Sequence, residues 1–292
     1  MRKILLASTA LVAMTSASAM AIEISGSTNL VYSNDDERAT DASQLQNEMD
    51  VTISFEATTD SGITTTMAMG FDEDNGGENG TNHDDSSATI SGDFGAIKIV
   101  VNGADDGYVV SMDEAFDMAG EGTGGTATTL GGSVGDSVSY QFPSVVDGMN
   151  VAVQHANEDG SESFGYGVQY DAGMAAVSVA RMNTNTTEYS HASISTAVSG
   201  LALAVEQNKE VTGATEAEST LYGMSYALDG ATLAYEMGST KDAGGTKTED
   251  YSQMALSYSV ATGITAVFTT SEIDSVAGTD VNETEVQLKL SF

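Results

Sequence analysis

The chain has no cysteine, no tryptophan and a single proline, Pro143, among its 292 residues. Without cysteine no disulfide framework supports the fold. Lys and Arg are also scarce, 9 against 43 Asp and Glu, which gives a formal net charge of −34. Because such a chain has no basic stripe to neutralise phosphates, this composition argues against a nucleic-acid partner.

Long apolar runs are missing as well. Beyond residue 21 no stretch approaches the roughly 18 consecutive apolar residues that a transmembrane helix needs. Before it, Arg2 and Lys3 precede a short apolar run, and two A-x-A cleavage patterns end at Ala19 and Ala21. We interpret residues 1–21 as a signal peptide cut after Ala21, with a retained anchor as the alternative. The mature chain, 22–292, is therefore expected to be exported.

A strong net charge can indicate disorder, but 40% of the residues are hydrophobic and they are patterned. Apolar and polar residues alternate, which predicts β-strands and excludes helical repeats. In the first segment Ile22, Ile24, Leu30 and Tyr32 share one face. The alternation recurs in sixteen segments, at about 22–32, 49–56, 63–71, 87–91, 96–101, 138–142, 149–156, 163–170, 174–181, 188–198, 201–208, 219–228, 231–238, 250–260, 264–272 and 283–292.

The connections between these segments alternate in length. Every second connection is tight and ends in glycine, as expected for hairpin turns with positive φ. The other connections are mostly long, polar and acidic. The glycines of the tight connections are Gly62, Gly95, Gly148, Gly173, Gly200, Gly230 and Gly263. Their spacing is even apart from one longer interval, between Gly95 and Gly148. That interval contains residues 102–135, the longest stretch without a strand pattern.

The two faces of the predicted strands differ in a way that favours a membrane barrel. One face holds Ile, Val, Leu, Met, Phe and Tyr, and the other holds Ser, Thr, Gly, Ala and Gln. Lipid outside and water inside a closed sheet require this arrangement. Sixteen strands leave an aqueous lumen, whereas about eight would be filled by side chains. We therefore predict an all-β, sixteen-stranded antiparallel transmembrane barrel.

Several ordered features resemble a Gram-negative general porin, most nearly the porins of Rhodobacter-like alphaproteobacteria. They are the start at 22–27 (IEISGS), the DSG and DFG turns at 60–62 and 93–95, the long acidic interval and the terminal EVQLKLSF at 285–292. The resemblance implies an outer-membrane homotrimer surrounded by lipid, with the third long loop folded inward as a constriction. It also implies that Phe292 is recognised by the barrel-assembly machinery.

The acidic interval supplies the candidate pore constriction. Within a narrow lumen, carboxylates enrich cations. A short helix is expected over 109–119, with Ser111 as its N-cap and Glu114 at N3. The resembling family faces this loop with a basic cluster, but here no basic residue lies between Lys98 and Arg181, and the inward strand positions offer mainly Lys98 and Lys289. The candidate constriction residues are Asp105, Asp106, Asp113, Glu114, Asp117, Glu121 and Lys98.

Other motifs are weaker. Residues 120–125 match G-x-G-x-x-G, but no βαβ unit surrounds them, so a flexible loop is the better interpretation. Asp72 and Asp74 begin an incomplete calcium loop, and loose structural calcium binding stays an alternative to a solvated acidic surface. The three histidines, His83, His155 and His191, have no metal-site or catalytic-triad spacing. We predict no enzyme activity and no cofactor.

The favoured function is a water-filled channel for passive diffusion of small hydrophilic solutes and ions, with a preference for cations. Two alternatives stay open: a substrate-specific channel with binding groups in the same loop, and a structural or adhesive surface barrel with a closed lumen. Saturable flux distinguishes the first alternative, and absence of conductance distinguishes the second.

Overall fold

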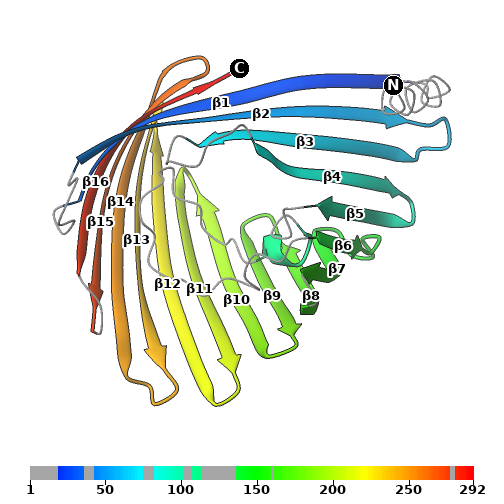
Figure 1. Ribbon diagram of the computed structural model, residues 1–292. Helices are drawn as coiled ribbons and strands as arrows, with labels where there is room; N and C mark the ends of the chain where they lie inside the picture. Colours follow the sequence, from blue (N-terminus) through cyan, green and yellow to red (C-terminus); the bar gives the residue numbers. More distant parts are fainter. Residues whose placement is uncertain are drawn as a thin grey trace.

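The computed structural model describes residues 19–35, 43–74, 82–101, 107–112, 136–158, 161–276 and 280–292. Sixteen strands pair in sequence order as one closed antiparallel barrel, and β1 pairs with β16 to close it (Figure 1). The predicted fold class is confirmed. The described residues include no helix that is both long enough and apolar enough to cross a membrane.

Strands β5 and β6 are the shortest, with 7 and 6 residues, and each of the others has 10 or more. Their bounds are β1 Ala19–Asp35, β2 Ser43–Thr58, β3 Thr64–Asp74, β4 Asn82–Gly92, β5 Gly95–Val101, β6 Asp136–Gln141, β7 Met149–Glu158, β8 Ser161–Asp171, β9 Ala175–Thr184, β10 Thr187–Val198, β11 Leu201–Thr212, β12 Thr215–Leu228, β13 Ala231–Asp242, β14 Lys247–Ala261, β15 Ile264–Ser275 and β16 Val281–Ser291. One 3₁₀ turn, η2 Val110–Met112, lies between β5 and β6.

The tight turns lie where the sequence predicts them. All seven glycines predicted to end these turns have positive φ, from 71° at Gly263 to 103° at Gly95. Ser199 also has a positive φ, 51°, directly before Gly200. Two consecutive left-handed residues match the right-handed twist of a hairpin. These turns fix the strand order at one end of the barrel.

At the other end, several connections are shorter than predicted. β11 and β12 continue through a polar, acidic stretch and meet at residues 213–214, and β9 and β10 meet at 185–186. The expectation of long loops is wrong for these hairpins. Outward side chains need to be apolar only where they contact lipid, whereas the backbone ladder forms with any side chain, so the strands continue beyond the alternating pattern.

The distribution of side chains is the reverse of that in a soluble protein. Apolar side chains point outward, and Ile24 is 61% exposed. The inner face is polar and largely buried, and Gln154 and Gln287 are each 1% exposed. The predicted assignment of the two strand faces is thus confirmed, and inner-wall side chains can be identified by their position along each strand.

The barrel closes where β1 meets β16. The backbone of Gly26 exchanges two hydrogen bonds with that of Phe292, at 3.1 and 3.2 Å. A Cβ at position 26 would lie 2.6 Å from the Phe292 ring and 2.8 Å from the Asp50 carbonyl oxygen. Glycine at position 26 therefore lets the terminal aromatic ring lie across the closing strand.

Candidate functional site

The chain that follows β5 turns into the barrel. Residues 107–112, which include η2, lie on the inner side of the sheet and contact β8 and β9 (Figure 1). This is the described part of the interval 102–135, and it lies inside the barrel, as predicted for the loop. We call residues 107–112 the inner segment.

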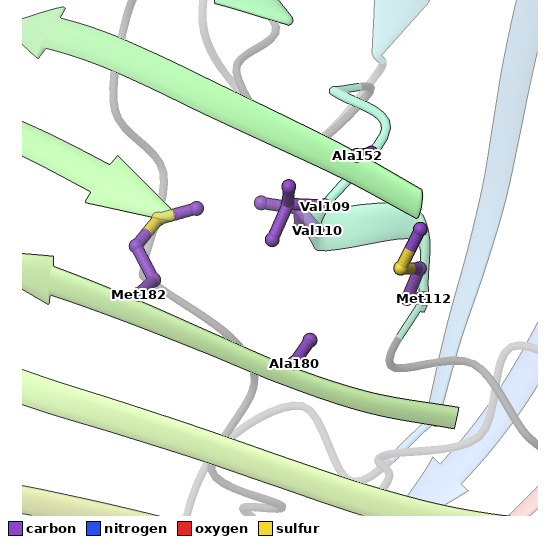
Figure 2. Close-up of a cluster of buried hydrophobic side chains, with 6 residues drawn as sticks. All are labelled: Val109, Val110, Met112, Ala152, Ala180 and Met182. Carbon is purple, nitrogen blue, oxygen red and sulfur yellow. The ribbon is translucent and has the colours of Figure 1, made fainter. Parts of the chain in front are cut away.

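Apolar contacts hold the inner segment against the wall. Figure 2 shows Val109, Val110 and Met112 facing three side chains of the wall, Ala152 of β7 and Ala180 and Met182 of β9. Val109, Ala152 and Met182 are each 0% exposed. Full burial of such a side chain stabilises a fold by about 1.5–3 kcal/mol, so these contacts attach the segment firmly.

Glycines on β8 make room for these contacts. A Cβ at Gly167 would lie 2.5 Å from the Met112 sulfur, and one at Gly165 would lie 3.1 Å from a methyl carbon of Val109. Gly107 is equally constrained, since a Cβ there would lie 2.1 Å from the Gln154 side chain. Contacts between residues that are far apart in the sequence therefore hold the inner segment against β7 and β8. We call the surface formed by Gln154, Gly165 and Gly167 the seat of the inner segment.

Polar contacts fix its backbone. Gln154 Oε1 accepts hydrogen bonds from the amides of Val109, at 3.1 Å, and Val110, at 3.4 Å. The Tyr108 amide donates to Ser139 Oγ on β6 at 3.3 Å. Burial raises the pKa of the Tyr108 phenol, and its hydrogen bond with Thr89 of β4 opposes that shift in part. The phenol is therefore neutral at physiological pH, and it connects the segment to a fifth strand, β4.

The structure does not describe the acidic residues of the predicted constriction. Asp105, Asp106, Asp113, Glu114, Asp117 and Glu121 all lie outside the described residues. Lys98 is described. It lies on the inner face of β5, where its register partners are Thr89 and Ser139.

The predicted N-cap is wrong. Ser111 is the middle residue of η2, its amide donates to the Gly107 carbonyl at 3.0 Å, and its hydroxyl donates to the Tyr108 carbonyl at 3.3 Å. An N-cap precedes its helix and accepts from later amides. Burial of Val110 and Met112 sets the turn earlier than the capping pattern indicates, and residues 113–119 of the expected helix are outside the described part.

The inner wall carries carboxylates that the sequence analysis did not single out. They occupy inward positions on β2 and on four later strands, β11, β13, β14 and β16. Glu283 and Glu285 are each only 7% exposed, and Gln287 donates to Glu285 at 3.1 Å. Strand alternation alone could have found these acids. They are Asp50, Glu56, Glu206, Glu210, Glu236, Glu249, Glu283 and Glu285.

The basic side chains are distributed differently. On the described strands Lys98 and Lys289 take inward positions, as predicted. Arg181 lies on the outward face of β9 in an ion pair with Glu188, and Lys209 lies on the outward face of β11, 2.6 Å from Glu216. Carboxylates therefore outnumber ammonium groups along the described inner wall.

The remaining candidates are the histidines, the incomplete calcium loop and the glycine-rich motif. Among the described residues no group of three or more His, Asp or Glu side chains could hold a metal ion. The side chains of Asp72, Asp74 and His83, and all of residues 120–125, lie outside the described part. His155 points outward from β7, whereas His191 of β10 is buried in a hydrogen-bond network on the inner wall.

Comparisons with known proteins agree with this architecture. A family model described as "Gram-negative porin" matches residues 7–291. In-vitro folded OmpT of Vibrio cholerae, an outer membrane protein in its trimer form, superposes with a TM-score of 0.77 at 12% identity, covering 94% of this chain and all of that one. A multiple mutant of the porin of Rh. blastica superposes with a TM-score of 0.73 at 13% identity, covering 93% of this chain and all of that one. No curated protein matches the sequence.

The chain therefore belongs to the Gram-negative porin family. It is an outer-membrane β-barrel that forms a channel for diffusion, as the sequence predicts. The Rhodobacter-like character of the resemblance rests on fold alone, because the Vibrio cholerae protein superposes comparably at similar identity.

Proposed function

We propose that this channel prefers cations over anions. The observation that carries the proposal is the composition of the described inner wall, where carboxylates on five strands face two lysines, Lys98 and Lys289. Carboxylates in a confined lumen attract cations and repel anions, and the field is stronger beside low-dielectric walls than in bulk water.

The acids of the 102–135 interval strengthen the same field in this proposal. Asp105 and Asp106 directly precede the inner segment, and Asp113 and Glu114 directly follow it. Because the inner segment is packed on the wall, we propose that both pairs contribute their charge to the lumen. The proposed constriction also includes Asp117, Glu121 and the inward-facing Lys98. The positive charge of Lys98 only weakly opposes the negative charge of the acids.

Reversal potentials test the preference. The purified protein is inserted into a planar bilayer between two KCl solutions of different concentration, and the zero-current potential is measured. We expect a potential of the sign given by K⁺ permeation, largest when both solutions are dilute, since screening reaches about 10 Å at 0.1 M and only about 3 Å at 1 M salt. A potential of the opposite sign contradicts the proposal.

We further infer that the chain works as a homotrimer, that residues 1–21 are removed on export and that Phe292 is read by the barrel-assembly machinery. Support for the trimer comes from the neighbour described in its trimer form. Chemical cross-linking of the protein in native membranes is expected to give a three-chain band that survives heating in detergent, whereas without the cross-linker heating leaves only the single chain. A single-chain band alone contradicts the trimer.

A further inference from the structure

Ser178 of β9 lies between the inner wall and the inner segment, and its hydroxyl meets three polar groups. Ser178 Oγ is 2.8 Å from the Met112 carbonyl oxygen, 2.9 Å from His191 Nε2 and 2.7 Å from Ser193 Oγ. All three distances are within hydrogen-bonding range. A hydroxyl has one proton to donate, so Ser178 can donate to only one of these groups.

The neighbours of His191 fix which ring nitrogen titrates. His191 Nδ1 is 2.7 Å from Asn208 Oδ1, and Asn208 Nδ2 donates to Glu206 Oε1 at 2.5 Å. An ionised carboxylate only accepts, so the Asn208 amide turns its NH₂ group to Glu206 and its oxygen to His191. Nδ1 therefore carries a proton in both charge states, and the ring gains or loses its second proton at Nε2, which faces Ser178.

The two charge states use the Ser178 proton differently. A neutral His191 presents a lone pair at Nε2, which takes the Ser178 proton and leaves the Met112 carbonyl without this donor. A protonated His191 donates from Nε2 to Ser178 Oγ instead. The Ser178 proton then goes to Met112, and Ser193 donates to the second lone pair of Ser178 Oγ. Only the protonated ring satisfies all of the contacts.

We propose that His191 is a positioning residue for the inner segment, whose protonation directs the Ser178 hydroxyl to the Met112 carbonyl and so latches the segment to the wall. Met112 is the last residue of the inner segment, immediately before Asp113 and Glu114. The latch therefore fixes the point at which the acidic part of the loop leaves the wall. This proposal is independent of whether the channel prefers cations.

The charged groups around His191 suit a buried imidazolium. Its side chain is 0% exposed, and the Glu206 carboxylate on β11 lies 4.0 Å from Nδ1. Glu210 is the next inward acid on β11. Arg181 on β9 points outward, and the inner segment contributes only the neutral Tyr108 phenol. A nearby carboxylate offsets the cost of burying the positive ring.

The sign of the pH dependence follows from the donor count. The protonated state is the latched one, so the latch is complete at low pH and is lost as pH rises and the imidazole loses its second proton. By linkage, latching and protonation favour each other to the same extent. The ratio of latched to released channels is expected to fall about fivefold across the titration, the equivalent of one net hydrogen bond.

Single-channel recordings of the full-length protein test the latch. We expect open-channel current fluctuations to increase as pH is raised from about 5 to about 8, the range of imidazole titration. His191→Gln places an amide NH₂ toward Ser178 at every pH, so this variant is expected to show the quiet, low-pH behaviour throughout. Ser178→Ala removes the donor to Met112 and is expected to show the high-pH behaviour throughout.

Two further variants separate the latch from other effects. His155→Gln removes the outward-facing histidine of β7 and is expected to keep the full pH step, and Ser178→Thr retains a hydroxyl and is expected to restore it. Heat-modifiable migration on gels shows whether each variant is folded. A wild-type channel with no change across this range overturns the proposal without any variant, and so does a folded His191→Gln channel whose pH step is unchanged.

Discussion

Two parts of the inner wall, roughly opposite one another, differ in chemistry. Strands β7–β9 offer small and apolar side chains, Ala152, Ala180, Met182 and the glycines of β8, and they hold the inner segment. Strands β14–β16 offer Gln253, Thr269, Ser271, Glu283, Glu285 and Gln287. In a closed barrel of sixteen strands, β8 and β16 are half a circumference apart.

Because of this difference, the strands that hold the inner segment are not the strands that carry the inward carboxylates. A segment packed on a wall removes water from that wall, and an unpaired carboxylate beneath it would lose its hydration at a cost of several kcal/mol. The wall beneath the inner segment is accordingly neutral at its inward positions. The carboxylates lie on other strands, so the barrel can vary its charge without disturbing the seat of the loop.

The largest effect is expected when the seat itself is filled. Gly167→Val places a branched side chain where a Cβ would already be 2.5 Å from the Met112 sulfur. The inner segment must then move toward the lumen, since the backbone of β8 is held on both sides. We expect lower single-channel conductance and a lower unfolding temperature, because overpacking costs about 1–3 kcal/mol.

Val168→Leu on the same strand is the matched control, since its side chain points outward. That variant is expected to keep wild-type conductance. Equal losses in Gly167→Val and Val168→Leu would show that β8 tolerates no enlargement on either face, and the comparison of the two walls would lose its basis.

A smaller effect is expected at Gln154. Gln154→Leu keeps the approximate volume but leaves the buried amides of Val109 and Val110 without their acceptor, a loss of about 1–3 kcal/mol. Gln154→Glu keeps an acceptor oxygen, and at acidic pH, where its buried carboxyl group is neutral, it is expected to retain most of the stability. Unfolding midpoints in denaturant measure both. If the two variants lose equal stability, the hydrogen bonds are not what attaches the segment.

Features that depend on neighbouring residues were predictable from the sequence. The sixteen strands follow from alternation, and the positive-φ turns follow from glycines such as Gly200 and Gly263, because hairpins are local structures. Alternation also placed Lys98 and Lys289 on the inner face. It marks Glu283 and Glu285 as inward in the same way, although the sequence analysis considered only the acids of the loop.

Features that join distant parts of the chain were not predictable. Gln154 meets Val109 across 45 residues, and Ser178 meets Met112 across 66. No local pattern marks Gly167 as the seat of Met112, and His191 has no spacing that identifies its network. The seat and the latch depend on which strands face a segment that folds inward, which only the closed barrel determines.

The smallest effect is expected from charge on the wall opposite the seat. The double variant Glu283→Gln, Glu285→Gln removes two carboxylates from β16 while keeping their shape, and the proposed cation preference should decrease without change in conductance fluctuations. The control, Glu188→Gln with Glu216→Gln, removes the same charge from outward ion pairs. We expect the reversal potential to move toward zero only in the inward pair, and less so at high salt, since screening shortens the reach of each charge.

An equal shift in both pairs would mean that net charge, rather than the position of carboxylates on the inner wall, determines selectivity. A shift in neither pair would assign the field to the acids of the 102–135 interval, as the proposed constriction requires.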